Sequence, residues 1–143
     1  ELRSVLIDKV DSAFGIKISS EIGMQLPVLA GAGIKAMLSL LTEKQVDALI
    51  GDAQFKKYTP NTIVDKDAYK REINTVRKEG IAFDREEYIE EMVAVGVPLN
   101  TNGRHIQAAI WAVGLKHQVP PEMVPALSNL LTEIAKEINQ RLI

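Results

Sequence analysis

Acidic residues cluster in one short stretch of the chain and are the first candidates for chemistry. Asp84, Glu86, Glu87, Glu90 and Glu91 lie close together in the sequence. Two carboxylates that face a cleft can act as a general acid and a general base, but only at a fixed separation. Nothing in the sequence fixes the separation of these groups. A solvated or interface face is therefore the simpler interpretation of the cluster.

The other residue types that carry chemistry are sparse. His105 and His117 stand apart from other candidate metal ligands, so we expect no metal site. The chain has no cysteine, which excludes disulfides, thiolate metal sites and a cysteine nucleophile and fits a cytoplasmic protein. No P-loop is present. We therefore expect no enzyme and no cofactor.

A glycine-containing segment, Ala30–Gly33, precedes an expected helix. The first amides of a helix lack partners and the helix dipole makes this end partly positive, so an organic carboxylate could bind there without an Arg or Lys. An alternative is at least as strong: Gly31 and Gly33 allow the helix to pack closely on a sheet.

Length and composition limit the classes of protein that remain. The chain has 143 residues, 46% of them hydrophobic, which suits one compact domain spanning residues 1–143. Lys plus Arg number 17 and Asp plus Glu 19, so the formal charge of −2 makes this chain a poor nucleic-acid binder. No apolar run is long enough to cross a membrane. The absence of an initiator Met suggests a piece of a longer protein or a processed chain.

The first half of the sequence predicts two short strands followed by three helices. The strands are Ser4–Val10 and Gly15–Ser19. One helix follows Gly33, and a second begins at the capping box Thr42–Gln45 and ends at Gly51. The side chains expected to be buried on these two helices are Ile34, Met37, Leu38, Leu41, Val46, Leu49 and Ile50.

A third helix is predicted from its ends and its apolar stripe. Asp65 is suited to cap its start and Gly80 to end it. Tyr69, Ile73 and Val76 recur on one face of this helix.

The second half predicts a hairpin and a closing helix. Met92–Leu99 and Ile106–Val113 are almost wholly apolar, which is typical of strands covered on both faces. Asn100–Gly103 between them predicts a tight turn and antiparallel pairing. Pro120 and Pro121 open the last helix. Its expected buried stripe is Met123, Leu127, Leu130, Ile134, Ile138 and Leu142. The fold class is α+β, an antiparallel β-sheet flanked by helices.

Several segments together resemble the IclR family of bacterial transcription regulators. Residues 76–87 are similar to the family pattern VRxxGYAxDxEE, residues 21–27 to xxGxxxPL and residues 58–63 to xTxxTI. Residues 31–36 resemble GxGKA, although Ile34 replaces the usual glycine before Lys35, which we interpret as a surface or interface charge. The resemblance implies the C-terminal effector-binding domain, with a GAF/PAS-like fold and without the N-terminal winged helix-turn-helix domain.

The resemblance also implies an effector site between the sheet and the first helix. Its expected residues are Ala32, Gly33, Asp84, Met92, Ala94, Trp111 and Val113. The family often has Cys or Ser in the first hairpin strand where this chain has Ala94. It often has Ser at the positions of Trp111 and Val113. Trp111 is equally well interpreted as a core residue that fills the pocket.

The function that these observations favour is sensing. We expect a small-molecule effector, an organic acid with an apolar or aromatic part, together with self-association as a dimer or tetramer. We expect contact with DNA only through the absent N-terminal domain, and no membrane partner. The alternatives are a purely structural oligomerisation module and a GAF-type signalling domain of another multidomain protein.

Overall fold

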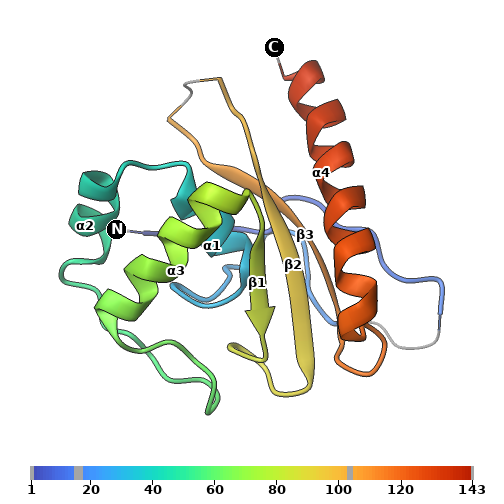
Figure 1. The fold of residues 1–143 in the computed structure, drawn as a ribbon, viewed down its shortest axis with the longest axis horizontal. Helices are drawn as coiled ribbons and strands as arrows, with labels where there is room; N and C mark the ends of the chain where they lie inside the picture. The colour runs from blue at the N-terminus through green and yellow to red at the C-terminus, as the bar shows by residue number, and fades with distance from the viewer. Residues whose placement is uncertain (1, 15–17, 103–104, 143) are drawn as a thin grey trace.

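The computed structural model describes residues 2–14, 18–102 and 105–142. Its described part is an α+β fold in which helices flank an antiparallel sheet, as the sequence predicted (Figure 1). The elements are α1 Ala32–Ser39, α2 Glu43–Ile50, α3 Lys66–Glu79, β1 Ala82–Arg85, β2 Met92–Leu99, β3 Ala108–Leu115 and α4 Val124–Arg141, with a short 3-10 helix at Pro121–Met123 before α4.

The three strands form one sheet in the order β1-β2-β3. Helix α1 packs on one face of the sheet with α3 beside it, and α4 packs on the other face (Figure 1). Successive side chains of a strand point to opposite faces. Ala94 accordingly belongs to the buried cluster under α1, whereas Val95 belongs to the cluster under α4. β2 therefore contributes to both halves of the core.

The predicted helix ends agree with the structure where a local hydrogen bond sets them. Thr42 and Gln45 form a complete capping box at the start of α2. The Asp65 carboxylate accepts a hydrogen bond from the N–H of Ala68 at 2.7 Å, which caps α3. Gly80 ends α3 with a φ of 74°, a left-handed conformation that glycine adopts without steric cost.

The predicted buried faces of α2 and α4 need correction. Leu49 is 38% exposed, although Val46 and Ile50 are buried as expected. On α4, Leu130 and Ile134 are 57% and 38% exposed. The side chains of α4 that pack towards the sheet are instead Val124, Leu127, Leu131, Ala135 and Ile138. The large apolar residues of α4 form one broad stripe, and periodicity alone did not select which edge of that stripe meets the sheet.

The two predicted N-terminal strands do not appear as strands. Only Val5 and Gln25 form an isolated antiparallel bridge, with backbone hydrogen bonds joining Leu6 to Met24 and Ser4 to Leu26. Residues 18 and 19 carry no strand, and residues 15–17 of the second prediction lie outside the described residues. A β-branched composition is compatible with a strand, but a ladder also needs a neighbouring strand that supplies partners.

The β2–β3 pairing is antiparallel as predicted, but the connection is longer than a tight turn. Leu99 pairs with Ala108, so eight residues, 100–107, connect the two strands. Gly103 lies outside the described residues. β2 is largely buried, whereas Val113 of β3 is 41% exposed. β3 is therefore not covered on both faces, which corrects the prediction from its apolar sequence.

Candidate functional site

Asp84 lies near the end of β1 and its side chain faces the start of α1. The residue is 8% exposed, and its Oδ1 accepts a hydrogen bond from the N–H of Glu87 at 2.7 Å. Its Oδ2 is 3.8 Å from the position that a methyl group on Gly31 would occupy. Burial raises the pKa of Asp84 above its ordinary value, and the Glu87 hydrogen bond opposes that rise. The site thus contains one desolvated carboxyl group next to a helix N-terminus.

The start of α1 is where the sequence placed it, with one difference. Ala32 and Gly33 are the first two residues of the helix rather than a turn before it, and both are buried. Gly31 is the N-cap with a φ of 95°, and no side chain caps the first amides. A charged or polar group at this position would therefore meet backbone donors.

Trp111 packs directly on Gly33. A methyl group at Gly33 would lie 2.9 Å from Cε3 of the indole, which is closer than carbon atoms approach. Gly96 has a similar role on β2, since a methyl group there would lie 3.2 Å from atoms of Ala32. Close packing of α1 on the sheet is thus one function of these glycines, and Trp111 narrows the space that an effector would occupy.

The remaining predicted residues fall on the same face of the sheet. Asp84 pairs with Ala94, and Ala94 pairs with Val113, so these three residues form one row across the strands. Ala94 is buried beneath α1, while Val113 is exposed. Met92 lies at the start of β2, two residues before Ala94 on the same side. The row therefore runs from a buried carboxyl group to an open edge.

Sequence reasoning missed the most deeply buried charge in the described part of the chain. Lys35 is 0% exposed, which corrects its interpretation as a surface charge. Its ammonium lies 2.9 and 3.0 Å from the two carboxylate oxygens of Glu87 and 3.0 Å from Oε1 of Glu72. A signal was present in the sequence: Lys35 is the one charge in the otherwise apolar or small helix Ala32–Ser39, and such a charge needs partners.

Three segments that the sequence analysis treated separately meet around this ion pair. The hydroxyl of Thr59 donates to the backbone oxygen of Glu86 at 2.6 Å, and the hydroxyl of Thr62 donates to that of Glu87 at 2.6 Å. Lys35 of α1 holds the side chain of Glu87. The turn after β1 is thereby connected to residues 58–63 and to α1.

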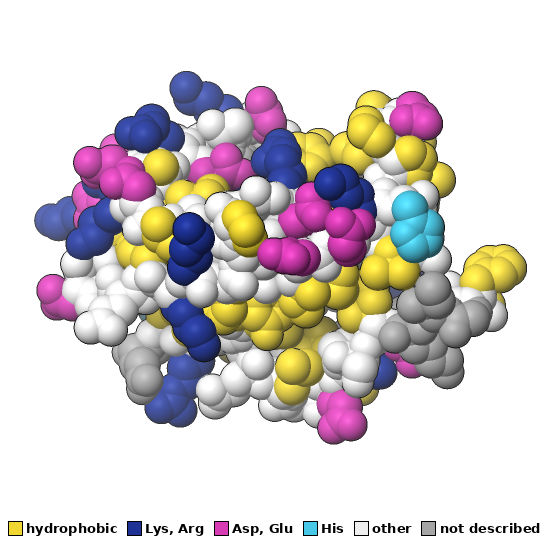
Figure 2. Space-filling model, turned by 90° about the horizontal axis from the view of Figure 1, so that it is seen from below, with side chains coloured by type: hydrophobic (Ala, Val, Ile, Leu, Met, Phe, Trp, Pro, Cys, Tyr) yellow, Lys and Arg dark blue, Asp and Glu magenta, His cyan; other side chains and the backbone are white. Residues whose placement is uncertain are grey.

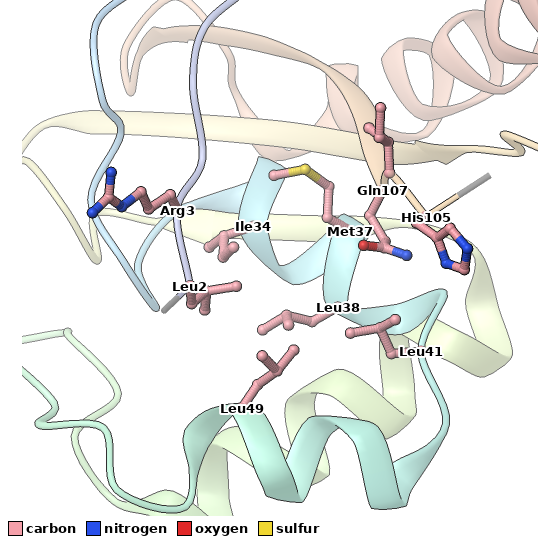
Figure 3. Close-up of a pocket in the computed structure, with 10 residues that line it drawn as sticks. Leu2, Arg3, Ile34, Met37, Leu38, Leu41, Leu49, His105 and Gln107 are labelled. Atoms are coloured by element: carbon pink, nitrogen blue, oxygen red, sulfur yellow. The ribbon is translucent and has the colours of Figure 1, made fainter.

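A cavity of about 240 Å³ lies elsewhere, beside α1, α2 and the end of the β2–β3 loop (Figure 3). Its wall is mainly apolar, with Leu38 and Leu49 facing each other across it and Gln107 pointing towards it (Figure 3). None of the seven predicted effector residues lines this cavity. It is therefore a separate feature from the site under α1.

The described residues offer no metal site. Within residues 2–14, 18–102 and 105–142, no group of three or more His, Asp or Glu side chains is arranged to hold a metal ion. Two of the clustered acidic residues are paired with cations: Glu87 forms an ion pair with Lys35, and Glu86 with Lys116 at 2.8 Å. Among the helices of these residues, none combines the length and hydrophobicity needed to cross a membrane.

Comparison with known proteins gives consistent matches over most of the chain. Residues 1–140 match the family model described as bacterial transcriptional regulator IclR, C-terminal. The chain is 29% identical over 136 residues to the acetate operon repressor of Salmonella typhimurium, covering 95% of this chain and 50% of the repressor. It spans about half the length of the curated relatives it matches.

Solved structures show the same similarity. The crystal structure of IclR from Thermotoga maritima is 31% identical with a TM-score of 0.91, and the match covers 98% of this chain and 57% of that one. A double mutant of the inducer-binding domain of the Acinetobacter transcription factor PobR was solved with 3-hydroxybenzoic acid. It is 27% identical with a TM-score of 0.75, covering 85% of this chain and 72% of that domain.

Proposed function

The chain belongs to the IclR family of bacterial transcriptional regulators, whose C-terminal domain it matches over residues 1–140, and we propose that it binds a small organic acid between α1 and the sheet. The observation that carries this proposal is the row Asp84–Ala94–Val113 beneath the uncapped start of α1. The amides at the N-terminus of a helix bind carboxylates. The buried carboxyl group of Asp84 can form a hydrogen bond with a second polar group of the ligand.

An acid with an aromatic or apolar part fits the walls of this site. Ala94, Trp111 and Val113 offer no side-chain donor beyond the indole N–H, so the body of the ligand must be accommodated by apolar contact. The ring of Trp111 lies against Gly33 and forms one wall. The exposed Val113 marks the open side through which a ligand would enter. The inducer-binding domain of PobR, solved with 3-hydroxybenzoic acid, is a related precedent for such a ligand.

A thermal-shift panel tests the proposal. Acetate, benzoate and 3-hydroxybenzoate are compared with benzyl alcohol, which keeps the ring and lacks the carboxylate. We expect at least one acid to raise the midpoint of unfolding in a saturable manner and benzyl alcohol to leave it unchanged, because a ligand that binds only the folded state stabilises it. If no acid stabilises the chain, or if benzyl alcohol does so equally, the proposed carboxylate site is wrong.

The full-length protein is proposed to couple this site to DNA. The curated relatives are about twice as long as the chain, and several are named HTH-type regulators or repressors. We propose that the sensing domain is accompanied by an N-terminal DNA-binding domain, and that it self-associates and acts in the cytoplasm. An effector can change DNA binding only if its affinity differs between two arrangements of the protein.

A purely structural oligomerisation module is the alternative. It predicts self-association that is insensitive to every acid in the panel. Sedimentation of the chain with and without each acid of the panel distinguishes the two, because a sensor changes its sedimentation behaviour or its stability on binding and a structural module changes neither.

A further inference from the structure

We propose that Lys35 is a positioning residue for the effector site: its buried ammonium holds the turn after β1 against α1, and the Glu87 N–H of that turn orients the Asp84 carboxyl group. This role deepens the proposed function and rests on it for its ligand-dependent part. The Lys35 ammonium hydrogen-bonds Glu72 and Glu87 rather than Asp84, although its charge also opposes the rise in the pKa of Asp84. Its positioning effect on Asp84 therefore passes through a neighbour.

Glu87 is that neighbour. Its carboxylate accepts both hydrogen bonds from Lys35, at 2.9 and 3.0 Å, and its backbone N–H donates to Asp84 Oδ1 at 2.7 Å. The same residue therefore joins the buried ammonium to the candidate ligand carboxyl. The orientation of Asp84 depends on where the backbone of Glu87 lies.

The connection closes into a ring of contacts. Lys35 stands in the first turn of α1, while Asp84 approaches Gly31 at the N-cap of the same helix. Helix α1 is therefore hydrogen-bonded to the turn after β1 through Lys35 and Glu87, and its N-cap lies near the side chain of Asp84 at the end of β1. The hydrogen bond from the Glu87 N–H to Asp84 joins these two places, so the turn is held both to α1 and to β1.

The charges around Lys35 are the reason to expect a strong effect on the turn after β1 when its ammonium is removed. Its ammonium faces two carboxylates, Glu87 and Glu72, and Arg85 Nη1 lies 3.7 Å from Oε1 of Glu72. A buried ammonium is tolerated only with such partners, and removal of one member leaves uncompensated buried charge. Without Lys35, Glu72 and Glu87 would repel each other, and Glu87 would be expected to turn towards solvent and carry its N–H away from Asp84.

Amide hydrogen exchange tests the positioning without any ligand. In the 143-residue chain, we expect Lys35→Met to speed exchange of the Glu87 N–H by about tenfold relative to the β2 amides of the same variant, since a charge-assisted interaction that anchors this residue is lost. Lys70→Met is the matched control, because Lys70 forms an exposed ion pair with Asp47. If Glu87 and the β2 amides accelerate equally, Lys35 has only a general structural role and the proposal is overturned.

A second variant keeps the test decisive if Lys35→Met does not fold. Glu87→Gln retains the size and the backbone N–H of Glu87 and removes the carboxylate that Lys35 holds. We expect the same selective loss of protection at residue 87. If the amide of residue 87 exchanges as slowly in Glu87→Gln as in the wild type, although Lys35 has lost its main ion-pair partner, the proposal is contradicted.

Calorimetric titration with 3-hydroxybenzoate tests the ligand-dependent part. Lys35→Met is compared in the wild-type and Asp84→Asn backgrounds. If Lys35 acts through Asp84, the Lys35→Met substitution should weaken binding by about tenfold in the wild-type background and little in the Asp84→Asn background. The reason is that the binding free energies lost at two coupled residues do not add. Equal weakening in both backgrounds overturns the role. If the wild type does not bind 3-hydroxybenzoate, the aromatic-acid part of the proposed function fails, while the exchange result still decides whether Lys35 fixes the turn.

Discussion

At the scale of single residues, the site is defined by buried polar groups. Asp84 is a carboxyl group whose burial raises its pKa, and Lys35 is an ammonium with no exposed surface. Such groups cost folding free energy unless they are paired. A desolvated carboxyl at the end of a strand, facing a helix start, is therefore a stronger functional indication than the acidic composition of the surrounding stretch.

Asp84 should leave a signature in the pH dependence of stability. Because its pKa in the folded chain lies above the ordinary value of 3.8, the folded state binds this proton more tightly than the unfolded state does. The stability contributed by that proton is complete below the ordinary value and is lost as the pH rises through the raised pKa.

Asp84→Asn keeps an oxygen that can accept the Glu87 hydrogen bond and removes the titration. We expect the variant to require more urea for unfolding than the wild type at neutral pH, and the difference to shrink as the pH falls through the raised pKa towards the ordinary value of 3.8 and to stay constant below it. Urea unfolding measured across this range checks it. A difference that does not vary with pH would show that burial of Asp84 carries no such cost.

Neighbouring residues of β3 should have separate effects because they point to opposite faces. Trp111 packs with the cluster under α1, and Ile110 packs with the cluster under α4. Trp111→Ala should change the rank order of acids in the thermal-shift panel. Ile110→Ala should leave the order unchanged and destabilise the fold by about 2 kcal/mol, as expected for a large-to-small change in a packed site. Equal shifts in acid preference would contradict the assignment of Trp111 to the effector wall.

At the scale of elements, the contact of α1 with the sheet decides the shape of the site. Gly33 lets the indole of Trp111 lie against the helix, and Gly96 lets Ala32 approach β2. A side chain at either glycine would push α1 away from the strands. The separation of α1 from the sheet, and with it the width of the effector site, is set by these two positions.

Gly33→Ala should therefore be destabilising only while Trp111 is present. The new methyl group would lie 2.9 Å from the ring, so we expect a loss of about 1–3 kcal/mol, typical of overpacking. In a Trp111→Ala background the same substitution should be nearly neutral, or stabilising, because alanine favours the helix. Urea unfolding of the four proteins gives the coupling energy. A cost that is equal in both backgrounds would mean that another contact opposes the methyl group.

At the scale of the whole molecule, several large apolar side chains are exposed. Met123, Leu130 and Ile134, at or near the outer side of α4, are 46%, 57% and 38% exposed. Figure 2 shows hydrophobic side chains as a band across the middle of the face seen from below. Exposed apolar surface of this kind is typical of sites of association. The proposed self-association would cover part of it.

Leu130→Lys should weaken self-association if α4 forms part of the interface. The substitution places a charge on an exposed apolar position without touching the core, so we expect a lower average mass by light scattering and an unchanged midpoint of unfolding per chain. Gln140→Lys adds the same charge at an exposed polar position of α4 and is the control. An unchanged mass for Leu130→Lys would exclude this part of α4 from the interface.

The sequence alone determined the features that arise within a few residues. The capping box at Thr42, the Asp65 cap and the left-handed Gly80 each follow from one local hydrogen bond or one backbone conformation. Alternation grouped Met92 with Ala94 on β2 and Trp111 with Val113 on β3, because side-chain direction within a strand depends on the parity of the position. The family resemblance, and not parity, predicted that the two groups share one face of the sheet, where Ala94 and Trp111 do pack together. These local rules were sufficient for the α+β class, whereas the assignment of an effector site to these residues stays a prediction.

Only the tertiary structure decided what each element packs against. Lys35 is buried because Glu87 and Glu72 arrive from distant segments, and the ring of Trp111 lies against Gly33 because α1 crosses β3 at that point. The exposure of Leu130 likewise depends on which side of α4 meets the sheet. Burial and charge pairing are properties of contacts between segments far apart in the chain, so no periodicity within one segment contains them.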